Sequence, residues 1–320
     1  MSTRDTETRA VSLVDIPLIQ RLSDKATALD SELEYTRDIH GPSGAVISSV
    51  LLPQRGLHTF VARANRQQVI GQLRLREDSP NAQITYIAPA PQVDMDDTAW
   101  LHILDTMTRE AGRNQIHALI AEVDESSYLF ETLRTAGFAV YARQQIWRRQ
   151  PGAYPTRAPA VQLVPYDEVD PHSVQLLLSH IVPPLVAQIS IPPAEKSASW
   201  VYPIKNRVEA YMYVSEGKYG TYIIPYINPE ILEDAAAILE STIARIHSTH
   251  RLPVYLCLRR HQEWLKSTLE DIFFEPGPRQ AVMVKHTTAR VRQTSFAKVR
   301  HGLRAITSIA QPPSEPISQW

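Results

Sequence analysis

Residues 82–141 read AQITYIAPAPQVDMDDTAWLHILDTMTREAGRNQIHALIAEVDESSYLFETLRTAGFAVY, and their patterns predict strand, helix, strand, helix and strand in turn. Apolar residues alternate in the strands, whereas Trp100, Leu104 and Met107 recur at helical spacing. A serine before Tyr128 and the glycine at Gly137 are typical of the start and end of a helix. The expected elements are a strand at 82–88, a helix at 98–113, a strand at 117–123, a helix at 128–136 and a strand at 138–147.

Much of this stretch recurs later in the chain without a gap. A shift of 136 residues places Thr85-Tyr86-Ile87-Ala88-Pro89 on Thr221-Tyr222-Ile223-Ile224-Pro225. A spacing kept over some fifty residues indicates a duplicated structural unit and not a local motif. The other identical pairs are Ala99 and Ala235, Thr106 and Thr242, Arg109 and Arg245, Leu129 and Leu265, Thr132 and Thr268, Leu133 and Leu269, and Phe138 and Phe274.

The segments around the repeat extend the same plan in both halves. Alternation and helical spacing predict further elements, while 38–55 fits either a helix or a loop. In the first half these are a strand at 10–14, a helix entered through Pro17, and strands at 57–64 and 69–76. In the second half they are a strand at 160–164, a helix after Asp170, a hairpin of strands 208–214 and 221–227, a helix at 231–247, a strand at 254–258, a helix at 262–272 and a strand at 282–291.

Domain boundaries follow from composition. A run rich in proline and small residues separates the two halves and is the best linker candidate. Apolar residues at helical spacing near the C-terminus predict one appended helix that the first half lacks. The expected organisation is a flexible tail at 1–9, an N-terminal domain at 10–149, a linker at 150–159, a C-terminal domain at 160–292, the appended helix at 293–310 and a flexible tail at 311–320.

Composition limits the classes of function. With 43% apolar and 21% charged residues the chain reads as a globular protein, and 320 residues suit about two domains. The net charge of −1 gives no global case for nucleic acid or an anionic membrane. Cys257 is the single cysteine, so a disulfide within the chain is excluded and no metal site is expected. No apolar run reaches the length of a membrane span, and a cytoplasmic location is the default expectation.

The order of elements resembles the GNAT family of acyl-CoA-dependent N-acyltransferases. The most recognisable motif runs from Tyr128 to Phe138 and looks like the family's helix leading into a strand that starts with Gly-Phe. Because two copies cover about Ala10 to Val291, the resemblance is to tandem GNAT proteins. It implies an α/β fold of two GNAT-like domains, each with a mixed, largely antiparallel sheet flanked by helices, followed by the C-terminal helix.

The resemblance also implies acetyl-CoA or another acyl-CoA as cofactor, but two family motifs are absent. GNAT members present a glycine-containing loop whose N–H groups bind the coenzyme pyrophosphate at a helix N-terminus. The corresponding loops here, 89–97 and 225–233, contain no glycine and carry acids. The family's frequent tyrosine acid is replaced by Leu133 and Leu269.

Candidate site residues come from this comparison and from residue type. Strand backbone would bind the cofactor at Tyr86, Ile87, Ala88, Ile223, Ile224 and Asn228. No catalytic residue is fixed by the sequence. Glu122 is a candidate base acting through water, with pairing to an arginine as the alternative, and Tyr226 is a second candidate.

Other residues have ordinary explanations beside functional ones. Tyr211, Tyr213, Tyr219, Tyr222 and Tyr226 either line a cleft between splayed strands or form cross-strand pairs. Cys257 fits a small buried hydrophobe better than a nucleophile. The corner Arg259-Arg260-His261 fits a solvated turn better than an anion site. The basic residues within 285–304 fit solvated faces better than a nucleic-acid contact.

Two functions therefore stay open. One is a GNAT-like N-acyltransferase that transfers an acyl group directly to an unknown amine or peptide acceptor. The other is a catalytically degenerate GNAT-like scaffold, a pseudoenzyme that senses a small molecule or joins an assembly. A homo-oligomer formed through the apolar stripe of the 293–310 helix is compatible with both.

Overall fold

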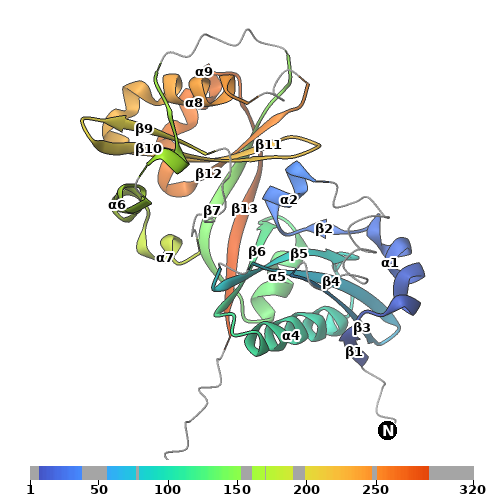
Figure 1. Ribbon diagram of the computed structural model, residues 1–320. Coiled ribbons are helices and arrows are strands. Elements are labelled where there is room, and N and C mark those ends of the chain that lie inside the picture. Colours follow the sequence, from blue (N-terminus) through green and yellow to red (C-terminus); the bar gives the residue numbers. More distant parts are fainter. Residues whose placement is uncertain are drawn as a thin grey trace, which may run out of the picture. The chain divides into compact units, whose positions relative to one another are not determined.

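The computed structural model describes residues 7–37, 56–76, 79–152, 161–169, 171–189, 199–246 and 251–287. These lie in one compact unit that spans 1–289. Thirteen strands of the described residues form one sheet in the order β1-β3-β4-β5-β6-β13-β7-β12-β11-β10-β9-β8, with β2 paired to β5 (Figure 1). The strands are β1 (Glu7–Ala10), β2 (Thr27–Ala28), β3 (Leu57–Ala64), β4 (Gln67–Leu75), β5 (Asn81–Ala88), β6 (Ala118–Asp124), β7 (Ala139–Arg149), β8 (Val164–Pro165), β9 (Trp200–Ile204), β10 (Arg207–Glu216), β11 (Thr221–Ile227), β12 (Val254–Arg259) and β13 (Glu275–His286).

Helices cover both faces of the sheet. In the N-terminal copy, β1 to β7, helix α4 buries Trp100, Ile103 and Met107 against the strands. Gly71 allows this close packing, because a Cβ there would lie 2.4 Å from the Cε of Met107. The helices are α1 (Ile16–Ser23), α2 (Ser31–Thr36), α4 (Thr98–Arg113), α5 (Tyr128–Thr135), α6 (Pro171–Ile181), α7 (Pro184–Ala187), α8 (Ala235–Ala244) and α9 (Lys266–Asp271), with 3₁₀ turns at Leu13–Asp15, Tyr166–Glu168, Pro229–Asp234 and Arg260–Leu265.

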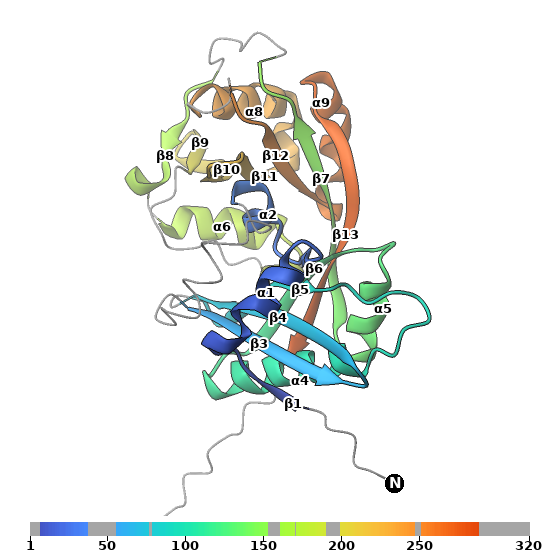
Figure 2. The ribbon, with the colours of Figure 1, turned by 90° about the vertical axis from the view of Figure 1, so that its right-hand side faces the viewer.

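The two copies exchange their closing strands. β7, the last strand of the N-terminal copy, pairs with β12 of the C-terminal copy, which comprises β8 to β13. β13 in turn inserts between β6 and β7 and pairs with both. The two long strands lie side by side through the centre of the unit (Figure 2). Each copy's sheet is therefore completed by a strand of the other. Outward from β13 the sheet continues with β6, β5, β4, β3 and β1, and outward from β7 it continues with their counterparts β12, β11, β10, β9 and β8.

The fold class expected from the sequence is confirmed. The sheet is mixed and largely antiparallel, and only the pairs β5–β6 and β11–β12 are parallel. Structural equivalence of the copies is clearest at the helix before each closing strand. Leu129 and Leu265, Leu133 and Leu269, and Phe138 and Phe274 are buried in corresponding cores.

The ungapped shift of 136 residues does not align β6 with β12 correctly. It carries Ala121, which faces the core under α4, onto Cys257, which lies on the opposite face beside Tyr222. Because side chains alternate between faces of a strand, an error of one residue reverses every position. The repeat therefore holds in the helices and slips between β6 and β12.

Several element boundaries also differ from the sequence expectations. The first strand is Glu7–Ala10, because residues 13–15 form a 3₁₀ turn whose Asp15 binds Arg9 at 2.6 Å. The strand expected at 160–164 is only Val164–Pro165, and α8 begins at Ala235 after a 3₁₀ turn. β13 begins at Glu275, seven residues before the predicted start, where a register shift lets its prolines enter the sheet. The strands β2 and β9 and the helix α2 were not predicted.

Some predictions fall outside the described residues. These are the segment 38–55, most of the linker at 150–159, both tails up to residue 6 and from 311, and the appended helix at 293–310 with most of the basic cluster.

A left-handed residue at the end of α9 gives the first testable prediction. Phe273 corresponds to Gly137, and both have positive φ, 66° and 89°. A side chain in this conformation costs about 1–2 kcal/mol, which glycine avoids. Phe273→Gly is therefore expected to raise the free energy of unfolding by about 1 kcal/mol, measured by urea denaturation. The mirror change Gly137→Ala should lower it by a similar amount, and a loss of stability in Phe273→Gly would contradict the explanation.

Candidate functional site

The two parallel strand pairs open into forks. β5 and β6 pair only from Asn81 to Gln83, opposite Ala118 to Ile120, and then separate. β11 and β12 pair only from Thr221 to Ile223, opposite Val254 to Leu256. The resemblance implies that a coenzyme would bind through strand backbone in such a fork.

The fork of the N-terminal copy is filled by the chain itself. β2 pairs with the free edge of β5, with Thr27 opposite Ile87 and Ala28 opposite Tyr86. The next residue, Leu29, donates its N–H to the Thr85 carbonyl oxygen at 2.8 Å and accepts from the Glu122 N–H at 3.0 Å. Its backbone therefore bridges the two strands at the point where they separate.

The side chains of this segment fix it in place. Leu29 is 0% exposed and belongs to the core under α4. Its carbonyl oxygen also accepts from Gln83 Nε2 at 2.6 Å, and the Ser31 N–H donates to Glu122 Oε2 at 2.9 Å. We call residues 27–31 the fork segment.

A chain of polar contacts continues from the fork segment across the central strands. The Ser31 hydroxyl donates to Gln280 Oε1 on β13 at 3.0 Å, and Gln144 Nε2 on β7 donates to the same oxygen at 3.1 Å. The Cys257 thiol on β12 then donates to Gln144 Oε1 at 3.4 Å. Burial raises the pKa of Cys257 to about 11, so the thiol stays protonated at neutral pH and is a poor nucleophile.

The helix start that would face a phosphate is already capped in the N-terminal copy. Asp96 Oδ1 accepts from the Thr98 N–H at 3.0 Å at the start of α4, and Asp94 and Asp97 flank it. A carboxylate in this position takes the place where the helix dipole favours an anion. The loop 89–97 contains no lysine or arginine.

The fork of the C-terminal copy is obstructed differently. Pro225 has no N–H, and its carbonyl oxygen accepts from Gln262 Nε2 at 2.7 Å. Gln262 is buried, and its Oε1 has no hydrogen-bond partner within the described part of the chain. At the following turn, Asn228 Oδ1 accepts from the Glu230 N–H at 3.2 Å and Asn228 Nδ2 donates to Glu209 at 2.6 Å. Among the described residues, the side chain of Gln262 enters this fork, and no chain segment pairs there as the fork segment does in the N-terminal copy.

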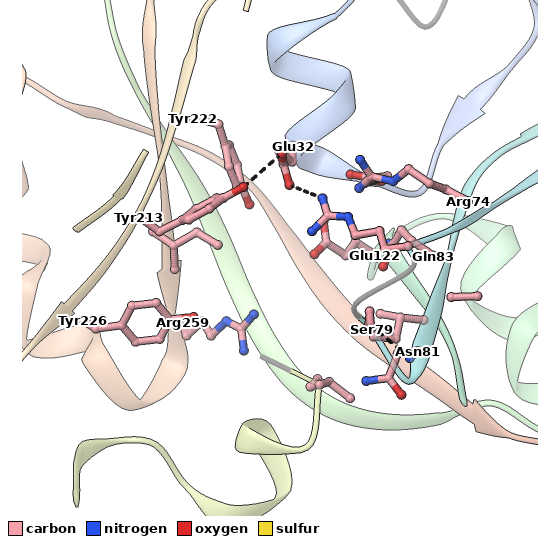
Figure 3. A pocket seen from close by; sticks show the side chains of 16 residues that line it. Glu32, Arg74, Ser79, Asn81, Gln83, Glu122, Tyr213, Tyr222, Tyr226 and Arg259 are labelled. Atoms are coloured by element: carbon pink, nitrogen blue, oxygen red, sulfur yellow. Dashed lines mark hydrogen bonds and ion pairs between the residues drawn. The ribbon is translucent and has the colours of Figure 1, made fainter. Parts of the chain in front are cut away.

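Beside the fork segment lies a cavity of about 130 Å³ that residues of both copies line (Figure 3). Glu122 and Gln83 point into it from the N-terminal copy, and Tyr222, Tyr226 and Arg259 point into it from the C-terminal copy. We call it the central cavity. Its further lining residues are Asp30, Glu32, Arg74, Arg76, Ser79, Asn81, Ala82, Ile120, Ile189, Tyr213 and Ile224.

Two of its carboxylates are bound to arginines. Asp30 pairs with Arg74 at 2.6 Å, and Glu32 pairs with Arg76 at 2.9 Å. Glu32 also accepts from the Tyr213 hydroxyl at 3.2 Å, so α2 of one copy is fixed to β10 of the other. Burial opposes ionisation of Glu32, but Arg76 and Arg74 outweigh it and lower its pKa.

Other acids near α2 are less well compensated. Burial raises the pKa of Asp30 to about 6, against the opposing effect of Arg74. Burial, together with the charges of Glu122 and Asp30, raises the pKa of Glu34 to about 7. The fork segment and α2 therefore bring Asp30, Glu32 and Glu34 together, with Arg74 bound to Asp30 and Arg76 bound to Glu32.

The turn between β10 and β11 is fitted closely to the end of α2. A Cβ on Gly217 would lie 2.0 Å from the Thr36 carbonyl oxygen, and a Cβ on Gly220 would lie 2.9 Å from that of Tyr35. Tyr35 stacks on Tyr255 with ring centroids 4.3 Å apart. The fork segment therefore leads directly into a helix that docks on the C-terminal copy.

The predicted site residues fall in different places. Glu122, Tyr226 and Ile224 line the central cavity together. Tyr86 and Ile87 pair with β2, Ala88 and Ile223 are buried in the cores, and Asn228 caps the turn after β11. The cross-strand explanation of the tyrosines holds for Tyr211 and Tyr226, which stack with centroids 5.9 Å apart, while Tyr213, Tyr222 and Tyr226 also line the cavity.

Arg259 is the clearest correction among the candidates. The sequence favoured a solvated corner, whereas the side chain is 5% exposed and points into the central cavity (Figure 3). His261 is half-buried, and burial with the charge of Arg259 lowers its pKa to about 4, so it is neutral near pH 7. The residues that sequence reasoning missed are Asp30, Glu32, Arg74 and Arg76, since their partners come from segments far apart in the chain.

No helix among the described residues is long and apolar enough to cross a membrane. Within the same ranges, no group of three or more His, Cys, Asp or Glu side chains is arranged to hold a metal ion.

The fold is similar to that of known acetyltransferases. The sequence matches no family model and no curated protein. Among solved structures, a GCN5-related N-acetyltransferase from Sphaerobacter thermophilus matches with a TM-score of 0.54 at 12% identity, covering 88% of this chain and 96% of that one. A tandem GNAT protein from the clavulanic acid biosynthesis pathway matches with a TM-score of 0.50 at 14% identity, covering 88% and 99%. The chain therefore has the fold of the GNAT N-acetyltransferases, built as two copies in tandem.

Proposed function

We propose that this chain uses the GNAT fold to bind a small polar molecule in the central cavity without coenzyme A. The observation that carries the proposal is the fork segment. Acyl-CoA-dependent acyl transfer is the activity that the fold suggests at family level, so the first question is whether the residues fit that coenzyme.

In the N-terminal copy they do not fit. The coenzyme would need the strand edge at Tyr86 and Ile87, which β2 already pairs, and the gap between the strands, which Leu29 fills. Its pyrophosphate would meet the helix start where Asp96 accepts the Thr98 N–H, and Asp94 and Asp97 would repel it.

The C-terminal copy fits little better. Proline removes one backbone donor from the fork edge, and the carbonyl oxygen of Pro225 is bound by Gln262. The turn that follows carries Glu230, Glu233 and Asp234 and no basic residue. In both copies, acids therefore stand where the family's anion site would lie. The central cavity, in contrast, is lined by charged and aromatic side chains of both copies.

A second candidate function is favoured by one observation. Of the residues that the structure describes, Gln262 is the one whose side chain enters the C-terminal fork, and none of them bonds to its Oε1; an amide group of a coenzyme would satisfy that oxygen. In this alternative the C-terminal copy is an acyl-CoA-dependent N-acyltransferase and the N-terminal copy is structural. Glu122 would then accept a proton from the acceptor amine, whose nitrogen would bond to the acyl carbon as the C–S bond breaks and coenzyme A leaves as the thiolate.

A titration with acetyl-CoA and with free coenzyme A distinguishes the two candidates. We expect no change in the unfolding temperature of the full chain with either compound. Binding at a hundred times the dissociation constant would instead stabilise the protein by about 2.7 kcal/mol.

The matched control is Gln262→Ala, which removes the side chain from the C-terminal fork and leaves the fork segment in place. A saturable stabilisation of the wild-type protein would contradict the proposal. Stabilisation of both proteins, with acetyl transfer to an amine, would establish the acyltransferase.

A further inference from the structure

The central cavity offers a carboxylate to a cationic ligand. Asp30 and Glu32 are bound to Arg74 and Arg76, whereas no ion pair joins Glu122 to a basic residue in the described part of the chain. The Ser31 N–H holds one of its oxygens at 2.9 Å, which fixes the direction of the side chain. Glu122 is therefore oriented into the cavity.

The opposite wall offers a guanidinium. Arg259 is the last residue of β12 and points into the cavity beside Tyr226 (Figure 3). Its side chain is almost fully buried, where a planar guanidinium binds a carboxylate more strongly than it does in water. Burial lowers the pKa of Arg259, but nearby groups, Tyr226 first and Glu122 among them, raise it overall. Glu122 and Arg259 therefore interact electrostatically.

The wall between these charges is partly apolar. Ile120 and Ile224 line the cavity from the two copies, and Tyr222 and Tyr226 add aromatic surface. The volume of about 130 Å³ is below the roughly 300–1,000 Å³ typical of pockets for drug-sized ligands. A ligand enclosed here is therefore small, with a short carbon chain between its charged ends.

We propose that the central cavity binds a small zwitterion, with its ammonium group on Glu122 and its carboxylate on Arg259. This inference rests on the function proposed above and specifies the ligand class of the same site. Because one charge is supplied by each copy, the ligand would bridge the two copies, and this explains why both forks are closed around a cavity that remains open.

The test uses the full chain and a series of probes. Glycine, β-alanine and γ-aminobutyrate carry both charges at increasing separation, while butylamine and butyrate carry one charge each. We expect saturable binding of at least one zwitterion in isothermal titration calorimetry. Butylamine and butyrate should bind roughly ten- to a hundredfold more weakly than that zwitterion, because each can contact only one of the two charged side chains.

Variants assign the two ends. Glu122→Gln keeps the size of the side chain and removes its charge, and should weaken zwitterion binding roughly tenfold or more. Arg259→Lys keeps a positive charge but loses the planar geometry, and should weaken binding of the carboxylate. Glu131→Gln changes an exposed carboxylate on α5 and should leave binding unchanged.

Each outcome decides the matter, and the ligand analogues do so on the unmodified protein even if Arg259→Lys does not fold. Equal binding of butylamine and the best zwitterion, equal binding of butyrate, or no binding by the whole series would overturn the inference. If the series fails while acetyl-CoA also fails to bind, the zwitterion assignment falls and the coenzyme-free function stands. If acetyl-CoA binds and a zwitterion also binds, the function falls and the assignment stands.

Discussion

Replacing Leu29 by alanine is expected to lower the free energy of unfolding by about 2–5 kcal/mol. The side chain is 0% exposed and lies in the core under α4, so its loss leaves a cavity inside the fork. The backbone hydrogen bonds to Thr85 and Glu122 do not depend on the side chain, and the effect therefore measures packing. Urea denaturation followed by circular dichroism gives the value.

The control is Leu176→Ala on α6, where the leucine is 57% exposed. This change should alter stability by no more than about 0.5 kcal/mol. If Leu29→Ala lowered the free energy of unfolding no more than Leu176→Ala does, residue 29 would not fill the fork. Coenzyme binding in the N-terminal copy would then no longer be excluded.

Replacing Glu34 by glutamine is expected to raise the free energy of unfolding at pH 8. Burial and the charges of Glu122 and Asp30 raise the pKa of Glu34 from 4.5 to about 7, so the folded protein holds an unfavourable charge at pH 8. A shift of this size corresponds to about 3 kcal/mol, which partial exposure reduces to about 2 kcal/mol.

The stability difference between Glu34→Gln and the wild-type protein should depend on pH in one direction. A carboxyl group whose pKa is higher in the folded state makes folding more favourable as the pH falls through about 7 toward 4.5, because the folded protein binds the proton more tightly. The advantage of Glu34→Gln should therefore be largest above pH 7 and should vanish near pH 4. Denaturation at a series of pH values measures this difference.

The control is Glu233→Gln, an exposed carboxylate before α8, whose difference from the wild-type protein should stay small at every pH. A Glu34→Gln protein less stable than the wild type at pH 8 would show that Glu34 has a cationic partner in solution. Glu34 would then not be the poorly compensated acid described above.

Much of the fold was accessible from the sequence because its signals are local. α4 was predicted with its observed bounds, since Trp100, Leu104 and Met107 recur at helical spacing and polar residues flank them. Ser127 and Gly137 mark the two ends of the next helix, and both have the expected roles, with Ser127 accepting the Leu129 N–H and Gly137 at positive φ. The duplication was likewise visible in the buried residues of these helices.

The same reasoning failed for the register of β6 and β12 and for the pairing of β13. A shift of 136 residues keeps several identities, but Ala121 and Cys257 face opposite sides of the sheet. Nothing in the sequence shows that β13 inserts between β6 and β7, because pairing of strands distant in the chain depends on tertiary packing. The exchange also determines which residues of the two copies meet.

The candidate site was predicted only in part. Glu122 and Tyr226 were identified by residue type and strand position, and both line the central cavity. The fork segment was missed because Thr27 to Ser31 has neither a strand pattern nor a helix pattern of useful length. Arg259 was judged by its basic neighbours, whereas its burial follows from the cavity formed by residues of both copies.

The central claim is that the chain's own residues occupy the fork of the N-terminal copy, and amide hydrogen exchange tests it most directly. The Leu29 N–H donates to Thr85 and the Glu122 N–H donates to Leu29, so both should exchange as slowly as the amides of the neighbouring core strands. Addition of acetyl-CoA should leave both rates unchanged. Exchange of the Leu29 amide at the rate of an open loop, or a change in these rates when acetyl-CoA is added, would contradict the account.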